Sequence, residues 1–350
     1  MVRLLKRLAA VSLVSLLGAC AGGAPESMSR LDTVKERGEL QCGVSGKLPG
    51  FSFLRTDGSY DGIDVDICRA VAAVVLGDSS AVDYRQLSAP ERFTALRSGE
   101  IDLLSRNTTA TLSRDSEGGN GLTFAPVVFY DGQGLMVRAD SGIATMEDLE
   151  GRTVCVGSGT TTERNLSDAF LAAGVNYNAL KFQEKDQVAS AYLQGRCESI
   201  TSDRSGLASM RSGFDDPSAH RILNAVLSKE PLAPATVAGD PRWSDAVRWT
   251  IYGLIAAEEF GITSANIQAM VNAAAADPNQ AAMRRFLGVD GGLGTKLGLP
   301  DDFVVRAVSA VGNYGEIYDR HLGPGSDVPI PRDLNSGYRD GGLHYAPPFN

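Results

Sequence analysis

The chain has 350 residues and a formal net charge of −9 at pH 7. An acidic chain is a poor partner for nucleic acids and anionic lipid surfaces, which attract basic patches. Its length exceeds that of a typical single domain and suits two lobes. None of its 5 cysteines forms a CxxC pair, which argues against a zinc site or a redox motif. We therefore predict no metal, no cofactor and no nucleic-acid partner.

The N-terminal residues have the layout of a signal peptide. Three basic residues accompany the apolar run Leu8–Leu17, which is too short to span a bilayer as a helix. The run ends in Leu17-Gly18-Ala19-Cys20, which resembles the lipobox of bacterial lipoproteins, where the cysteine is acylated. We predict a signal peptide over 1–19, lipidation of Cys20 as the only membrane anchor, and a tether over 20–30. A plain signal-peptide cleavage site is the alternative.

From Glu39 onward, short apolar runs alternate with stretches of helical periodicity. This alternation is typical of β/α units around mostly parallel sheets and predicts an α/β protein. The predicted strands are Leu40–Val44, Val82–Arg85, Ile101–Leu104, Thr153–Val156 and Ser199–Thr201. The predicted helices are Ile63–Leu76, Pro90–Arg97, Thr162–Ala172, Asp186–Gln194 and Ser244–Phe260.

The chain starts a sheet twice, because a strand, a loop and a helix follow one another near Leu40 and again near Thr153. Between these units, Tyr130-Asp131-Gly132-Gln133-Gly134 is placed to cross a hinge, and a second crossing is predicted near Lys229-Glu230-Pro231-Leu232. Two crossings make the first lobe discontinuous. The predicted division is 31–131 with 232–350 for lobe 1 and 132–231 for lobe 2. The stretch after Pro300 is predicted to be a terminal extension wrapped on lobe 1.

Four cysteines remain when Cys20 is set aside. An even number in an oxidising compartment favours disulfides, although three pairings are possible. Pairing neighbours in sequence would put one bridge in each half of the chain. Buried free thiols are the alternative. The residues concerned are Cys42, Cys68, Cys155 and Cys197.

A first candidate anion site lies at Gly159-Thr160-Thr161-Thr162-Glu163, which follows a predicted strand and begins a helix. Thr160 and Glu163 have capping-box spacing. The remaining N–H groups of the first turn, with the positive end of the helix dipole and the threonine hydroxyls, could hold a carboxylate or phosphate. An ordinary helix cap is the alternative.

A hydroxyl-rich loop follows the strand predicted at 101–104. It runs from Ser105 to Arg114, and the Arg114 guanidinium could grip a carboxylate with two hydrogen bonds. Ligands of open α/β sheets bind at the carboxyl ends of the strands, where this loop lies. The alternative for Arg114 is a surface ion pair with Asp115. For Arg106 we favour a structural role.

Asp203 also follows a predicted strand and precedes a helix. It could be a helix N-cap, or its carboxylate could hold an ammonium group. A fixed cation and a fixed anion facing each other across a cleft would recognise a zwitterion while keeping each buried charge paired. Such a pair of opposite charges is what a binding site for an amino acid requires.

Other residues carry no prediction of catalysis. His220, His321 and His344 lack partners at ligand spacing, and the chain contains no GxxxxGK[ST], GxSxG or HExxH motif. Trp243 and Trp249 lie on an apolar helix and are predicted to belong to the core. We therefore favour a binding protein over an enzyme.

Several longer strings resemble a known family. The GIDVDICRAV helix, SRNTTATLSRD, VCVGSGTTTE and GRCESITSDRSGL are similar to extracellular solute-binding proteins of the polar amino-acid type. LSAPERFTALRSGEIDLLSRNTT, YDGQGLMV, VGNYGEIYDR and GGLHYAPP are similar to the general L-amino-acid binding proteins of ABC importers. The resemblance runs from about Leu31 to the C-terminus.

This resemblance implies a two-lobed periplasmic-binding-protein fold of type II, a Venus flytrap with two hinge crossings. It implies that Arg114, with Thr109 and the helix start at Thr160 and Thr161, holds the ligand's α-carboxylate. Asp203 and the Asn107 region would hold its α-ammonium. The implied disulfides are Cys42–Cys68 and Cys155–Cys197.

Two features bear on the expected ligand range. Related binders with narrow specificity often place an aromatic ring on the ligand from the first loop, where this chain has Leu48-Pro49-Gly50. Close relatives usually show an aromatic residue where this chain has Ala110. A less shaped pocket would suit broad specificity.

The resemblance predicts the solute-binding subunit of an amino-acid ABC importer, which delivers L-amino acids to a membrane permease. We expect a monomeric lipoprotein in the periplasm or at the cell surface. Two alternatives remain: a periplasmic enzyme on the same fold, of the cyclohexadienyl dehydratase or transglycosylase type, and an amino-acid sensory subunit.

Overall fold

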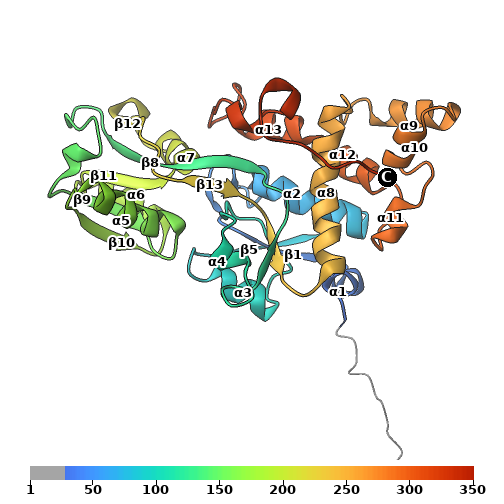
Figure 1. Cartoon of the computed structure of the whole chain (residues 1–350), viewed down its shortest axis with the longest axis horizontal. Helices are drawn as coiled ribbons and strands as arrows, with labels where there is room; N and C mark the ends of the chain where they lie inside the picture. The colour runs from blue at the N-terminus through green and yellow to red at the C-terminus, as the bar shows by residue number, and fades with distance from the viewer. Residues whose placement is uncertain (1–27) are drawn as a thin grey trace, which may run out of the picture.

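The computed structural model describes residues 28–350. The predicted signal peptide, Cys20 and most of the tether lie outside the described residues. The described chain forms two α/β lobes joined by two strands, with lobe 2 at the left of Figure 1 and lobe 1 around the long helix α8. No helix within 28–350 is long and apolar enough to cross a membrane.

Lobe 1 is built on a five-stranded sheet in the order β5-β1-β6-β14-β7. β1 pairs parallel with β5 and β6, whereas β14 pairs antiparallel with β6 and β7. A small antiparallel sheet of β2, β3 and β4 lies beside it. The strands are β1 (Leu40–Val44), β2 (Lys47–Leu48), β3 (Ser52–Leu54), β4 (Tyr60–Asp61), β5 (Val82–Gln86), β6 (Leu103–Leu104), β7 (Leu122–Phe124) and β14 (Ala235–Val237).

Ten helices within 28–350 belong to lobe 1. Most residues of α2 are buried, and α8 and α12 pack against it. α8 begins at Pro241, three residues before the predicted start, because Asp240 caps the Trp243 amide and proline fits the first turn. The helices are α1 (Arg30–Arg37), α2 (Ile63–Leu76), α3 (Arg92–Ser98), α4 (Leu112–Asp115), α8 (Pro241–Glu259), α9 (Ile267–Ala276), α10 (Ala281–Phe286), α11 (Leu293–Lys296), α12 (Phe303–Val311) and α13 (Tyr314–Leu322).

Lobe 2 is a sheet covered by helices, in the order β10-β9-β11-β8-β12. Alternate residues of its strands enter different cores: Val154 and Val156 pack with α5, whereas Cys155 packs with α6 and α7. Both faces are therefore buried. The elements are β8 (Phe129–Arg138), β9 (Thr153–Gly157), β10 (Asn178–Phe182), β11 (Ser199–Asp203), β12 (His220–Ile222), β13 (Lys229–Leu232), α5 (Thr161–Ala173), α6 (Lys185–Leu193) and α7 (Arg204–Ser212).

The two connections between the lobes are β8 and β13, which pair antiparallel with Glu230 opposite Asp131. Both lie in the segments predicted to cross the hinge, and the predicted boundaries at 131/132 and 231/232 fall inside this pair. The C-terminal stretch reaches β8 as well. The Tyr130 amide donates to Asn335 Oδ1 at 2.7 Å, and Asn335 Nδ2 donates to Tyr130 O at 3.1 Å.

Each lobe contains one disulfide. Cys42 of β1 bonds to Cys68 of α2, and Cys155 of β9 bonds to Cys197 just before β11. This is the pairing that the resemblance implied. The first bridge ties α2 to the lobe 1 sheet, and the second ties the segment before β11 to β9 in the lobe 2 sheet.

The predicted core tryptophans differ in depth. Trp243 is fully buried and its Nε1 donates to the Asp102 carbonyl at 2.8 Å. Trp249 is partly buried and packs edge-on against Phe349 near the C-terminus. The C-terminal extension thus covers part of α8, the helix whose tryptophans were predicted to belong to the core.

Candidate functional site

The two lobes touch across the cleft through side chains as well as through the hinge. Asn107 Nδ2 of lobe 1 donates to Asp203 Oδ2 of lobe 2 at 3.1 Å. The Thr109 and Thr161 hydroxyls lie 3.3 Å apart, and Ser209 Oγ donates to the Pro49 carbonyl at 2.7 Å. The structure is therefore a closed arrangement of the lobes.

A cavity of about 40 Å³ lies between the lobes. The loop after β6 and the start of α3 line it from lobe 1, and the starts of α5, α6 and α7 line it from lobe 2. Such edges of α/β sheets are where ligands bind. The lining includes every predicted ligand residue except Arg114: Asn107, Thr109, Thr160, Thr161 and Asp203.

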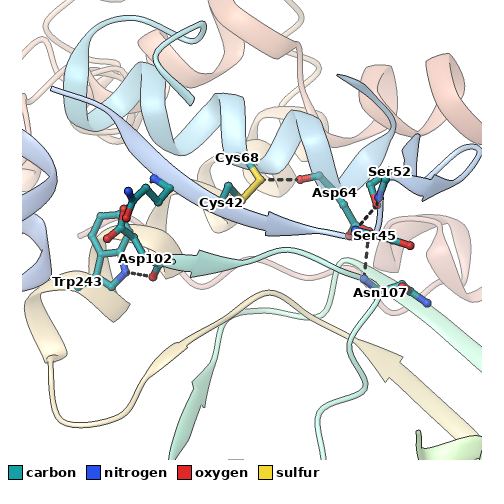
Figure 2. The surroundings of a disulfide bond; sticks show 10 residues. Cys42, Ser45, Ser52, Asp64, Cys68, Asp102, Asn107 and Trp243 are labelled. Carbon is teal, nitrogen blue, oxygen red and sulfur yellow. Dashed lines mark hydrogen bonds between the residues drawn. A yellow bond between two sulfur atoms is a disulfide. The ribbon is translucent and has the colours of Figure 1, made fainter. Parts of the chain in front are cut away.

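Asn107 has an unusual backbone and a specific support. Its φ is +32°, in the left-handed region that asparagine tolerates better than most residues. Its amide donates to Asp64 Oδ2 at 3.1 Å, and Figure 2 shows how α2, held to β1 by the Cys42–Cys68 bridge, presents Asp64 to this loop. Burial raises the pKa of Asp64 to about 6. The Asn107 Oδ1 atom is buried and has no hydrogen-bond partner among residues 28–350.

Asp203 stands at the N-cap position of α7, but its side chain makes no capping hydrogen bond. The Ser205 amide of that first turn instead donates to Asp131 Oδ2, at 3.1 Å, from the hinge strand β8. Asp131 thus does the capping and leaves the Asp203 carboxylate facing the cavity. Burial raises the pKa of Asp203, and the nearby Lys185 ammonium opposes that rise.

Arg114 lies in an adjoining open groove rather than in the cavity. Thr160 and Thr161 line both spaces, so the groove and the cavity meet at the start of α5. Arg114 Nη1 donates to the Thr109 carbonyl at 2.8 Å, and its guanidinium lies 5.1 Å from the Phe93 ring centre. No ion pair joins Arg114 to Asp115 in the described chain. Burial lowers the pKa of Arg114 to about 10, which leaves it charged at neutral pH.

The start of α5 departs slightly from a capping box. Thr160 Oγ1 accepts from the Glu163 amide at 3.0 Å, as the spacing predicts. The Glu163 carboxylate accepts from the Gly159 amide at 2.8 Å and not from the N-cap amide. The predicted capping box therefore forms only in part.

Sequence reasoning missed the role of Glu230, which was assigned only to the hinge. Its carboxylate is fully buried and accepts from Thr109 Oγ1 at 2.5 Å and Thr161 Oγ1 at 2.8 Å. Asn165 Nδ2 and Ser228 Oγ donate to its other oxygen. Two of the three threonine hydroxyls predicted to hold a ligand carboxylate therefore donate to an internal carboxylate in this arrangement.

Three buried cationic groups around the cavity were also missed as ligand candidates: Arg92, Arg106 and Lys185. Arg106 keeps the structural role expected for it, since its Nε donates to the Leu87 carbonyl at 2.7 Å, yet it also lines the cavity. Arg92 and Lys185 are the first residues of α3 and α6. Their position after strand-loop units was the available signal, because helix starts gather at the binding edge of such sheets.

The first-loop segment Leu48-Pro49-Gly50 and Ala110, which were expected to bear on the ligand range, lie outside the cavity lining. Ala110 is not part of the cavity lining, and its amide donates to the Pro231 carbonyl at 2.9 Å. Leu48 is fully buried in the core, and Pro49 contacts lobe 2 through Ser209. Neither places a ring in the cavity.

The chain belongs to the bacterial extracellular solute-binding proteins, family 3, whose model matches residues 40–280. It is 47% identical over 329 residues to the general L-amino acid-binding periplasmic protein AapJ of Rhizobium johnstonii, which covers 93% of this chain and 94% of the relative. It is 44% identical over 345 residues to the glutamate/glutamine/aspartate/asparagine-binding protein BztA of Rhodobacter capsulatus, with coverage of 99% and 100%.

The fold has a similar solved counterpart, an ABC transporter periplasmic binding protein from Brucella ovis with glutathione bound. The two chains are 43% identical with a TM-score of 0.88, and the match covers 93% of this chain and 100% of the other. The predicted family and the type II two-lobed fold are thereby confirmed. The relatives named here are described as binding proteins, in keeping with the predicted class.

Proposed function

We propose that this chain captures L-amino acids outside the cytoplasm and delivers them to the permease of an ABC importer. One observation carries the amino-acid assignment. The buried Asp203 carboxylate and the unpartnered Asn107 Oδ1 face one cavity, and together they offer two acceptors to an ammonium group. A buried acceptor without a donor is costly, and an α-ammonium would satisfy it.

The α-carboxylate is assigned to the side of the cavity nearest Arg114. Thr160 and Thr161 line both the cavity and the groove of Arg114, and they begin α5, whose first-turn N–H groups favour an anion. The Thr109 hydroxyl lies beside Thr161. A carboxylate there would compete with Glu230 for the two hydroxyl protons, so ligand entry is coupled to rearrangement at the hinge.

Capture follows a closing motion about β8 and β13. Asn107 contacts Asp203 and Pro49 contacts Ser209 across the cleft, so the cavity lies behind contacts between the lobes. We expect the lobes to separate for ligand entry. A ligand that contacts Asn107 and Asp203 at once binds the closed form better than the open one, and this difference in affinity shifts the population toward closure.

The proposal includes the lobe boundaries, the oligomeric state and the membrane anchor. Lobe 1 comprises 31–131 and 232–350, lobe 2 comprises 132–231, and the chain acts as a monomer. Acylation at Cys20 would tether it to a membrane, because stable attachment takes more than one acyl chain and a diacylated cysteine supplies two. The paired strands β8 and β13 support the division.

The ligand range is proposed to be broad. AapJ is named a general L-amino acid-binding protein, BztA binds four amino acids by its name, and the Brucella ovis protein holds glutathione. The cavity lining contains no aromatic side chain, which suits several side chains. Turnover is not part of the proposal, since the relatives' names describe binding.

Titration calorimetry tests this function. Protein lacking residues 1–20, refolded to remove bound ligand, is titrated with a panel of L-amino acids, their D-enantiomers and glutathione. Saturable binding of several L-amino acids is the expected result. Binding of glutathione alone would replace amino acids by a tripeptide as the ligand. Consumption of prephenate or arogenate would favour the enzymatic alternative.

A further inference from the structure

The ammonium group of Lys185 is the most conspicuous unpaired charge in the described chain. Lys185 begins α6 in lobe 2 and lines the cavity between the lobes. Its Nζ is buried, although the residue as a whole is half-buried, and it has no hydrogen-bond partner within 28–350. A buried ammonium needs compensation, because removing it from water is expensive.

The charged groups facing Lys185 come from four other elements. Asp203 at the end of β11 and Asp64 of α2 attract it, whereas Arg106 after β6 and Arg92 of α3 repel it. Asp64 already accepts from the Asn107 amide. Asp203 is the carboxylate assigned to the ligand's ammonium. Each carboxylate that attracts Lys185 thus has another partner, and neither forms a hydrogen bond with the Lys185 ammonium.

The side chains that line the cavity include three cationic groups, Arg92, Arg106 and Lys185, and one carboxylate, Asp203. Three further carboxylates, those of Asp64, Glu184 and Glu230, act on these cations from outside the lining. Arg92 also has an unpartnered buried atom, Nε, and only a 3.4 Å hydrogen bond to Thr108 Oγ1. The buried Lys185 Nζ and Arg92 Nε atoms thus remain without an acceptor in the described chain. The side-chain carboxylate of a dicarboxylic amino acid would supply one, whereas an apolar side chain would not.

We propose that Lys185, together with Arg92 and Arg106, forms a subsite for a second carboxylate, so that, within a broad range of L-amino acids, the site binds most tightly those whose side chain ends in a carboxylate. The subsite rests on the proposed function and names the ligand class that the site holds best. Lys185 reaches it from lobe 2 and the arginines reach it from lobe 1. A dicarboxylic ligand therefore joins the lobes at both of its ends.

The side-chain carboxylate acts through charge, so glutamine is the matched neutral ligand for glutamate. The two differ only in whether the side chain ends in a carboxamide or a carboxylate. We expect the wild-type protein to bind L-glutamate about 10-fold or more tighter than L-glutamine. Replacing Lys185 by methionine keeps much of the stem and removes the charge. We expect it to weaken glutamate binding by about 30-fold or more, on the scale for losing a buried charge pair, and glutamine binding by less than about 3-fold.

The pH dependence supplies a test that needs no variant. Burial lowers the pKa of Lys185 to about 8. A bound carboxylate stabilises the ammonium form and raises that pKa, so glutamate binding is strongest below pH 8 and weakens as the pH rises above it. The α-ammonium is a slightly stronger acid in glutamine than in glutamate, so its titration cannot lower the glutamate-to-glutamine affinity ratio. The glutamate-to-glutamine affinity ratio should therefore fall between about pH 7 and pH 9.

The decisive experiment is calorimetry of wild type, Lys185→Met, Lys185→Arg and the control Lys296→Met with both ligands, followed by the wild-type pH series. Lys296 is exposed on α11, far along the chain in lobe 1. Lys185→Arg should keep the glutamate preference. Equal wild-type affinity for glutamate and glutamine at both pH values would overturn the subsite and leave the proposed function standing. Failure to bind any amino acid would overturn the proposed function itself.

Discussion

The two lobes differ in how they are built and in what they bring to the cleft. Lobe 1 has one large core, which α2, α8, α12 and α13 share with the C-terminal stretch. Lobe 2 has two small cores, one on each face of its sheet. Lobe 1 contributes Asn107 and two arginines to the cavity, whereas lobe 2 contributes Asp203, Lys185 and the start of α5.

This difference explains why neither lobe is a complete site. The charge of Arg106 is opposed by Asp64 within lobe 1 as well as by Asp203 of lobe 2, and that of Arg92 by Asp203 and by Glu230 of the hinge. Burial lowers the pKa of Arg106 to about 10, and the Asp64 and Asp203 carboxylates oppose the shift. Closure therefore brings opposite charges together, and a ligand completes the balance. The experiments below test this division of labour, from the largest expected effect to the smallest.

Removing a disulfide should have the largest effect on stability. The Cys42–Cys68 and Cys155–Cys197 bridges close segments with sequence separations of 26 and 42. Replacing either pair by alanine should lower the free energy of unfolding by about 3–4 kcal/mol, with a slightly larger loss for the longer loop. Calorimetric or denaturant unfolding of the two double variants measures this. Loss of the lobe 1 bridge alone should also weaken ligand binding, because it frees α2 and Asp64 beneath Asn107. Equal binding by both double variants would contradict that coupling.

Truncating the proposed ligand charges compares the lobes directly. Arg114→Ala in lobe 1 and Asp203→Ala in lobe 2 should each weaken amino-acid binding by more than about 2 kcal/mol, because each leaves a ligand charge buried without its partner. Titration calorimetry measures the loss, with Asp168→Ala on the exposed side of α5 as the control. If Arg114→Ala binds like wild type, the α-carboxylate lies in the cavity away from the Arg114 groove. If Asp203→Ala does so, the ammonium assignment fails.

The hinge should show a pH-dependent contribution from Asp131. Burial raises its pKa to about 7, and the neighbouring Asp203 carboxylate adds to the rise. The folded protein thus holds this proton more tightly than the unfolded chain, whose pKa lies near 3.8. The stability that Asp131 contributes is therefore present below pH 4 and is lost as the pH rises from about 4 to about 7.

Asp131→Asn removes this titration while keeping one acceptor for the Ser205 amide. Across that pH window, wild type should lose unfolding free energy relative to the variant, by about 1.4 kcal/mol for each unit by which folding raises the pKa of Asp131. Denaturant unfolding at several pH values gives the difference, and Asp140→Asn, in the exposed turn after β8, is the control. If the difference in unfolding free energy between wild type and Asp131→Asn stays constant with pH, Asp131 does not titrate on unfolding in this window.

The surface contact between the lobes should matter least. Lys47 Nζ lies 3.1 Å from Glu184 and 3.3 Å from Asp186 across the cleft, and all three side chains are partly exposed. Lys47→Ala should weaken ligand binding by less than about 1 kcal/mol, since water and salt screen exposed ion pairs. The small loss should disappear at high salt. A larger or salt-independent loss would mean that this pair helps to hold the lobes closed.

The sequence by itself determined the class of the protein and much of its layout. Apolar periodicity located β1, α2, β9, α5 and β11 to within a residue or two, because these elements each bury a continuous face. The motif strings gave the family and both disulfides. The family resemblance supplied the candidates Asn107, Thr109, Thr160, Thr161 and Asp203, which all line the cavity. Their roles as ligand residues stay a prediction.

Only the tertiary structure decided which charges share the cavity. Lys185 and Arg92 are ordinary residues at helix starts in the sequence, and their burial depends on how the lobes meet. The sequence places Glu230 in a hinge segment and indicates nothing more. In the structure its carboxylate accepts hydrogen bonds from the hydroxyls of Thr109 and Thr161. Asp131 caps α7 from another strand and thereby frees Asp203. These contacts join residues far apart in the chain, and local sequence patterns carry no information about such long-range packing.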